Sequence, residues 1–503
     1  MSDLNKRRSG ILLHITSLPS QYGIGDFGPE AYKFADFLTK TKQSIWQILP
    51  LSPIEPAMGN SPYNSSSAFA GNKYIISPDL LIKDGLLSQE DIEQKPTFAP
   101  NKVEYRKIIK YKTGLLNKVY DNFKNKVEDD KFEMFCSENT QWLEDFALFT
   151  ACKKHFNNKI WNAWPIEVRD RAPESIEKLK NELENNIEKE KFFQYLFFKQ
   201  WYLLKQYCNN LNIQIVGDMP IYVDHDSADV WSKSEFFNLD GNKNPAYVSG
   251  VPPDYFSKTG QLWGNPVYRW DILKNDGYSW WLQRMEHNLK MYDLVRLDHF
   301  RGFVQYWEVA VSEKNAMNGR WVNGPGEELF HAMAQRFPNL PIIAEDLGII
   351  TPDVIELKEK FCLPGLKVLL FAFGEDFSTN PYAPHNHVKN CLVYTGTHDN
   401  NTVRGWFETK ATAEEKTRLG KYLGEEMTLD NVNWKMITLA MKSVANTVII
   451  PMQDLLGLGS EARMNTPSKK TGNWEWQMRS SELSPSLVKN LKELTKIYGR
   501  VSL

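Results

Sequence analysis

The chain has 503 residues, a length that accommodates about three domains or one large barrel with insertions. Hydrophobic residues make up 42 % and charged residues 24 %, which is typical of a soluble globular protein. Because 60 Lys and Arg residues balance 62 Asp and Glu residues, the formal net charge is −2, and the chain lacks the positive field that nucleic-acid binding requires.

The first apolar run lies at 10–17, where His14 interrupts the series from Ile11 to Ile15. It is too short for the core of a signal peptide, and no window reaches the ~18 apolar residues of a membrane-spanning helix. Five cysteines without a Cys-x-x-Cys pair indicate neither a disulfide framework nor a zinc site. We therefore expect a cytoplasmic protein without a membrane partner.

The same run is the first of eight short, β-branched and apolar segments, many of which end in polar or turn-forming residues. Such runs are typical of strands in a parallel sheet that is buried on both faces. Helical patterns lie between most of them, for example at 30–40, 353–361 and 413–423. The alternation predicts an α/β chain folded as a (β/α)8 TIM barrel, a single domain over 1–503. The eight predicted strands are 10–17, 44–51, 213–223, 293–299, 341–347, 366–373, 390–397 and 446–452.

Two long gaps interrupt this alternation. The first, 53–212, contains the Lys- and Glu-rich stretch 173–207, and we predict a mainly helical insertion between strands 2 and 3. The second, 224–292, contains the Gly-, Pro- and aromatic-rich segment 250–265, which is too irregular for a helix or strand and long enough to be an active-site lid. Only a short tail follows strand 8, so no C-terminal β-domain is expected.

Aromatic residues make up 13 % of the chain and include 16 Trp. Core packing accounts for many of them, but several lie beside Gly, Pro and Asn in the loop-like segments 61–64, 261–265 and 472–476. Flat rings at polar loop positions suit sugar recognition, because a pyranose has an apolar face and a polar edge.

Titratable residues follow four of the predicted strands. In a TIM barrel the active groups lie at the carboxyl ends of the strands, which here carry Asp218, Asp298, Glu345 and Asp399. Each carboxylate alone is more often a helix cap or ion-pair partner. Asp298, Glu345 and Asp399 converging at one end of a barrel, with an inward Arg, instead indicate an active site.

Two of these carboxylates are expected to differ in ionisation. The two-residue period of a strand places Arg296 on the same face as Asp298, and a fixed guanidinium favours an ionised carboxylate. Glu345 follows an apolar Ile-Ile-Ala run and has Asp298 and Asp399 nearby, so we expect its pKa to be raised. One ionised and one protonated carboxyl group are the pair that glycosidic chemistry requires.

Three motifs, Val-Arg-Leu-Asp-His-Phe at 295–300, Ile-Ala-Glu-Asp-Leu-Gly at 343–348 and Tyr-Thr-Gly-Thr-His-Asp-Asn-Asn at 394–401, resemble the carboxylate-bearing blocks of the α-amylase superfamily. Additional blocks narrow the resemblance to the 4-α-glucanotransferase family, also called amylomaltases or glycoside hydrolase family 77, over nearly the whole chain. These blocks are 11–20, 22–28, 61–63, 217–223, 250–265, 451–459 and 465–467.

The resemblance implies a role for each matching residue. Asp298 would be the nucleophile that forms a covalent glucosyl enzyme, Glu345 the general acid and then base, and Asp399 the stabiliser of the transition state. Arg296 and His398 would position Asp298 and hydrogen-bond the sugar. The other implied substrate-binding residues are Ser61, Tyr63, which would stack on the sugar, Asp218, Asp254, Gln261, Trp263, Asp346 and Asn465.

The resemblance also implies the reaction. A segment of α-1,4-glucan would pass from a maltooligosaccharide or linear glucan to the 4-hydroxyl of another glucan or of glucose. Asp218-Met-Pro-Ile stands where typical amylases carry Asn-His, which argues against calcium, and no other cofactor is expected. An α-1,4-glucan hydrolase and a non-catalytic glucan-binding barrel are the alternatives, and we expect a monomer.

Overall fold

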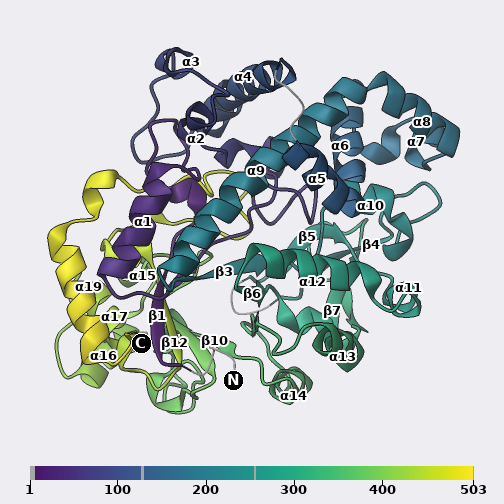
Figure 1. The fold of residues 1–503 in the computed structure, drawn as a ribbon. Helices are drawn as coiled ribbons and strands as arrows, with labels where there is room; N and C mark the ends of the chain where they lie inside the picture. Colours follow the sequence, from purple (N-terminus) through teal and green to yellow (C-terminus); the bar gives the residue numbers. More distant parts are fainter. Residues whose placement is uncertain (1–5, 126–129, 254–256, 502–503) are drawn as a thin grey trace.

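The computed structural model describes residues 6–125, 130–253 and 257–501. Eight parallel strands form one sheet in the order β10-β11-β12-β1-β2-β3-β6-β9 (Figure 1). Each strand overlaps one of the eight predicted runs, so the predicted TIM-barrel class is confirmed. The strands are β1 Arg8–Leu12, β2 Ile45–Gln47, β3 Gln214–Met219, β6 Leu294–Leu297, β9 Ile342–Ala344, β10 Gly365–Val368, β11 Cys391–Tyr394 and β12 Thr447–Pro451.

The sheet curves round until its two end strands meet. The backbone N–H of Ala344 in β9 donates a hydrogen bond of 2.9 Å to the carbonyl oxygen of Pro364, directly before β10. Close packing also fixes one glycine, because a Cβ at Gly217 in β3 would lie 2.1 Å from the ring of Tyr292. Asp218, the next residue of β3, faces the opposite side of the strand from Gly217.

Apart from the two long insertions, most connections between barrel strands contain helices that bury one apolar face. In α1, Ala31, Phe34, Ala35 and Leu38 follow the helical period and are all buried. None of the helices in the described parts of the chain combines the length and apolar character needed to cross a bilayer. The helices between these barrel strands are α1 Pro29–Lys40, α13 Gly326–Arg336, α14 Pro352–Lys360, α15 Val403–Thr409, α16 Ala413–Leu423 and α17 Val432–Lys442, and α18 Met452–Leu455 and α19 Pro485–Ile497 follow β12.

In its described residues, the connection between β2 and β3 contains eight α-helices and no strand of either sheet. Figure 1 shows these helices in blue above the barrel, with α9 running back to it. The predicted helical stretch 173–207 consists of two helices that meet at Leu183. The helices are α2 Pro78–Lys83, α3 Gln89–Glu93, α4 Tyr105–Lys124, α5 Asp130–Glu138, α6 Thr140–His155, α7 Ile166–Arg169, α8 Pro173–Glu182 and α9 Glu184–Asn210.

The connection between β3 and β6 corrects one expectation. The segment 250–265 was expected to lack regular structure, but its ends belong to two antiparallel strands of a second sheet, ordered β5-β4-β7-β8. These two strands are hard to predict from the sequence for two reasons. Glycines and a β-bulge interrupt the alternation of apolar and polar residues, and β7, the other partner of β4, comes only after β6. The elements of this connection are α10 Ala228–Ser232, β4 Tyr247–Val251, β5 Gln261–Pro266, α11 Trp270–Asn275 and α12 Ser279–Met291. The second sheet is completed after β6 by β7 Gln305–Ala310 and β8 Gly319–Asn323.

Arg500 ties the end of the chain to the amino-terminal end of the barrel. Its guanidinium is fully buried and donates hydrogen bonds to the carbonyl oxygens of Met441 at 3.0 Å, Ser443 at 2.9 Å and Arg8 at 3.1 Å. Burial lowers the pKa of this group to about 9. Arg500 therefore joins β1, the segment before β12 and the segment that follows α19.

Substituting Arg500→Ala is expected to lower the free energy of unfolding by roughly 3 kcal/mol, because buried carbonyl oxygens lose their donors. Urea unfolding followed by circular dichroism measures this change. Lys496→Ala, which removes an exposed positive charge from the same end of the chain, is the matched control. An equal midpoint for the two variants would contradict the role of Arg500.

Candidate active site

The carboxyl ends of β3 and β6 bring Asp218 and Arg296 together. The two residues are partners in the parallel register of these strands, so their side chains share a face. Nη1 of Arg296 lies 2.7 Å from each carboxylate oxygen of Asp218, and both side chains are buried. Burial raises the pKa of Asp218 and Asp298 adds to the rise, whereas Arg296 opposes it.

The same guanidinium also holds Asp298. Nη1 of Arg296 lies 2.9 Å from Oδ1 of Asp298, which confirms that the two side chains share one face of the strand end. Burial lowers the pKa of Arg296, but Asp218 and Asp298 outweigh it and raise the pKa well above its usual value. The side chain of Asp298 is 28 % exposed, so a fixed cation holds a carboxylate that a ligand can reach.

Glu345 follows β9 and is held by two backbone donors. The N–H of His299 donates to Oε2 at 2.8 Å, and the N–H of Leu347 donates to Oε1 at 2.9 Å. Burial raises the pKa of Glu345 to about 7, and Asp298 adds to the rise, while Arg296 and the two backbone donors oppose it. The expected direction is confirmed, with burial rather than like charge as the leading cause.

His299 directs its N–H at Glu345 from a left-handed backbone conformation, with φ of 51° and ψ of 54°. This conformation is uncommon for a residue other than glycine and persists only where the surroundings determine it. Burial lowers the pKa of the His299 ring to about 4, so the ring is neutral near pH 7.

Asp399 lies after β11, which is separated from β9 by β10 alone. Nδ2 of Asn465 donates to Oδ1 of Asp399 at 2.6 Å, and Nη2 of Arg463 donates to the backbone carbonyl of Asp399 at 2.6 Å. Nε2 of His398 lies 3.5 Å from the same Oδ1. The side chain of Asp399 is 44 % exposed, so it also faces the open mouth.

Aromatic rings form a wall beside these carboxylates. Tyr63 stacks on His398, with ring centroids 5.2 Å apart and an angle of 15° between the planes. Trp474 lies 5.7 Å from Tyr63 and 6.0 Å from His398. The sequence marked the loop of Trp474 as aromatic and Gly-rich, but gave no signal that it would meet Tyr63.

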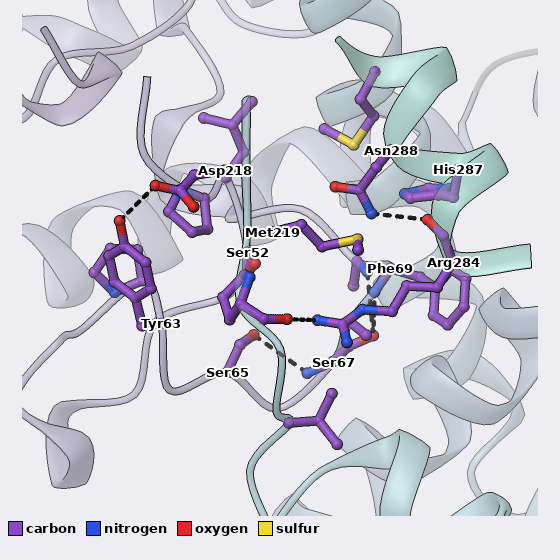
Figure 2. A pocket seen from close by; sticks show the side chains of 18 of the residues that line it. Ser52, Tyr63, Ser65, Ser67, Phe69, Asp218, Met219, Arg284, His287 and Asn288 are labelled. Atoms are coloured by element: carbon purple, nitrogen blue, oxygen red, sulfur yellow. Dashed lines mark hydrogen bonds between the residues drawn. The ribbon is translucent and has the colours of Figure 1, made fainter. Parts of the chain in front are cut away.

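The Tyr63 hydroxyl donates to Oδ2 of Asp218 at 2.8 Å, as Figure 2 shows. Burial, followed by the charge of Asp218, raises the pKa of Tyr63 well above its usual value. Ser61 holds the backbone of Tyr63, because its Oγ accepts the N–H of Tyr63 at 3.2 Å. Tyr63 is therefore held at both its backbone and its hydroxyl.

Tyr63 and Asp218 also line a pocket (Figure 2). Arg284 on α12 lines it and donates to the carbonyl oxygens of Pro220 at 2.5 Å and Ile221 at 3.0 Å. These two carbonyls follow β3 directly, so Arg284 fixes the turn next to Asp218.

Trp263 and Gln261 lie on β5, at the edge of the second sheet. The Trp263 ring meets the ring of His299 edge to face at 4.8 Å, and Oε1 of Gln261 accepts the Trp263 indole N–H at 3.3 Å. Through His299 these two residues connect to the surroundings of Glu345. Asp254, the other predicted residue of this segment, lies outside the described residues.

Asp346 is the predicted site residue that the structure places apart from the others. One carboxylate oxygen accepts Nζ of Lys358 at 2.6 Å, and the other accepts the N–H of Leu366 at 2.6 Å. Because consecutive residues after a strand face opposite ways, Asp346 turns toward β10 while Glu345 turns toward Asp298.

Sequence reasoning assigned no site role to His14 or Arg463, and it marked Trp474 only as one ring of a loop suited to sugar recognition. His14 faces the side of His398, and burial, followed by the charge of His398, lowers its pKa to about 3. In the described ranges no three His, Cys, Asp or Glu side chains gather as they would around a metal ion. The arrangement instead presents an exposed carboxylate fixed by a cation opposite a buried carboxyl group that can hold a proton near neutral pH.

Comparison with known proteins points the same way. The model of one family, described as 4-alpha-glucanotransferase, matches residues 13–483. A 4-alpha-glucanotransferase of Clostridium butyricum is 48 % identical over 493 residues, covering 97 % of this chain and 100 % of that protein. One of Aquifex aeolicus is 46 % identical over 494 residues, covering 98 % and 99 %. A solved amylomaltase from Streptococcus agalactiae in complex with acarbose has a TM-score of 0.95 and 40 % identity, covering 99 % of this chain and 100 % of that one.

Proposed function

This chain belongs to the 4-alpha-glucanotransferase family, and we propose which of its residues carry out each step of the reaction. The activity is transglycosylation, in which a glucan segment moves from one α-1,4-glucan to another. The alternative of a glucan hydrolase is not favoured by these relatives. The roles below follow from the positions of the side chains in the barrel mouth.

In the first half of the reaction, Asp298 attacks the anomeric carbon of the donor sugar. Glu345 gives its proton to the glycosidic oxygen, so that the bond to the leaving chain breaks while the bond to Asp298 forms. The observation that carries this assignment is the different setting of the two groups. Nη1 of Arg296 lies 2.9 Å from the partly exposed carboxylate of Asp298, whereas burial raises the pKa of Glu345 to about 7.

In the second half, Glu345 takes the proton from the 4-hydroxyl of the acceptor, whose oxygen attacks the anomeric carbon and releases Asp298. Asp399, held by Asn465, hydrogen-bonds the sugar and stabilises its positive charge in both transition states. Tyr63 supplies a fixed ring on which that sugar stacks.

The remaining proposed sugar contacts surround these groups. Asp218 and His398 keep Arg296 and Asp399 in place and complete the central subsite, and Gln261 and Trp263 line the neighbouring one. We include Ser61 as the residue that positions Tyr63, and Asp346 as a residue that fixes the segment after Glu345.

The proposed partners are maltooligosaccharides and linear α-1,4-glucans, with glucose as an acceptor. We also propose that the protein is a cytoplasmic monomer and needs no cofactor. The acarbose bound to the amylomaltase of Streptococcus agalactiae supports a sugar ligand. Free thiols at all five cysteines suit a reducing compartment.

Incubation of the purified protein with maltotriose alone tests this function. We expect glucose and a ladder of longer maltooligosaccharides, because each donor can also serve as an acceptor. A parallel reaction with EDTA should give the same ladder. Glucose and maltose in equal amounts without longer products would make the protein a hydrolase, and loss of the ladder in EDTA would show that a metal takes part.

A further inference from the structure

A row of apolar side chains crosses the second sheet on the face opposite Trp263. Leu262 pairs with Gly250, Gly250 with Trp307, and Trp307 with Trp321, so the side chains of one row point to the same side. Leu262 is 38 % exposed and Trp321 is 36 % exposed. The row therefore ends in a large indole ring that is open to solvent.

The Trp321 ring is held in one orientation by its neighbours. The guanidinium carbon of Arg301 lies 4.0 Å from the ring centroid, and Trp307 meets the ring at 5.2 Å with an angle of 66° between the planes. Arg301 is itself buried and donates to the carbonyl oxygen of Ile349. A ring that is fixed in advance loses little conformational freedom when a ligand stacks on it.

The residues that support this ring belong to the same loops as the proposed catalytic groups. Arg301 follows Asp298 by three residues, and Ile349 follows Glu345 by four. At 3.8 Å between consecutive Cα atoms, these separations are at most about 11 Å and about 15 Å. Ile349 is 54 % exposed, so an apolar side chain continues the surface from the ring toward the barrel mouth. Because Arg301 contacts the ring, Trp321 lies beside the loop that follows Asp298.

We propose that Trp321 binds a sugar unit of a long α-1,4-glucan outside the catalytic subsites and raises the preference of the enzyme for long chains. The proposal rests on the proposed function, because a glucan that leaves the mouth on this side extends along the loop that carries Ile349. The apolar face of a pyranose stacks on the indole, and the exposed side chain of Asn323, two residues along β8 on the same face, offers hydrogen-bonding groups to its hydroxyls. Trp321 thus acts on specificity and not on the chemical step.

The test compares two substrates in three variants. Trp321→Ala should lower kcat/KM about tenfold with long amylose, chiefly through KM, since a lost stacking contact of about 1.4 kcal/mol corresponds to that factor. With maltotriose, which is too short to reach the ring, kcat/KM should stay unchanged. Trp321→Phe should retain part of the preference for amylose, because phenylalanine keeps an aromatic ring at this position. Tyr422→Ala on α16 removes an aromatic ring of the same 36 % exposure and should change neither substrate.

A direct binding measurement removes the dependence on turnover. In the Asp298→Ala background, calorimetric titration with a long maltooligosaccharide should show the same weakening for Trp321→Ala, and titration with maltotriose should not. Equal losses on both substrates, or no loss on amylose, would overturn the proposal. A dimer that Trp321→Ala converts to a monomer in light scattering would instead assign the ring to a second copy of the chain. Failure of the unchanged protein to disproportionate maltotriose would contradict the proposed function and not this surface.

Discussion

Asp298→Ala is expected to reduce transfer from maltotriose by several orders of magnitude, because the covalent route needs a carboxylate at this position. Nη1 of Arg296 lies 2.9 Å from that carboxylate, and the side chain of Asp298 is open to a ligand. The measurement is the initial rate of glucose release and ladder formation. Asp430→Ala, which removes an exposed carboxylate far along the sequence after α16, is the control for loss of charge.

Azide provides a second readout for the same variant. With α-maltosyl fluoride as donor, azide in the space left by the Asp298 carboxylate should restore turnover and give a β-glycosyl azide, which has the configuration of the lost intermediate. Retention of more than about a tenth of the rate by Asp298→Ala without azide would identify another nucleophile.

Glu345→Gln is expected to slow transfer from maltotriose by about 10²- to 10⁴-fold, the contribution typical of a general acid. The effect on fluoride release, which reports the first step, should be much smaller with α-maltosyl fluoride, because fluoride leaves without a proton. Glu356→Gln on α14, an exposed carboxyl group, should behave as the unchanged protein with both donors. Equal slowing of Glu345→Gln with both donors would remove the assignment of general acid.

The pH dependence follows from the raised pKa of Glu345. The group donates its proton in the first step, so it must be protonated in the free enzyme. With a pKa raised to about 7, it is protonated below pH 7 and loses its proton above it. The value of kcat/KM should therefore fall as the pH rises through about 7. In Glu345→Gln this alkaline fall should disappear, and an identical profile would assign it to another group.

Local chemistry made the barrel and the carboxylates predictable. Each barrel strand is a short apolar run, because both faces of a parallel sheet are buried and the pattern needs no knowledge of the partner strand. The two-residue period was enough to pair Arg296 with Asp298, because it uses only neighbours in the sequence. The apolar run before Glu345 predicted a raised pKa together with the expected convergence of Asp298 and Asp399 at one end of the barrel.

Pairing between distant segments decided the rest. The second sheet joins β4 and β5 to β7 and β8 across β6, so no local pattern marks it. Trp474 meets Tyr63 only because the loops after β2 and β12 converge at the barrel mouth. The resemblance implied that Asp346 binds substrate, yet its carboxylate accepts hydrogen bonds from Lys358 and from the N–H of Leu366.

The sequence by itself determined the eight strands, the carboxylates that we propose as catalytic, and the family, since each depends on residue type and short spacing. The tertiary structure decided which side chains meet. Burial gives Glu345 its pKa of about 7, and the stacking of Trp321 on Arg301 creates a surface beside the mouth. Both depend on the desolvation and packing of residues that are distant along the chain, because solvent exclusion is a property of the assembled barrel and not of any one segment.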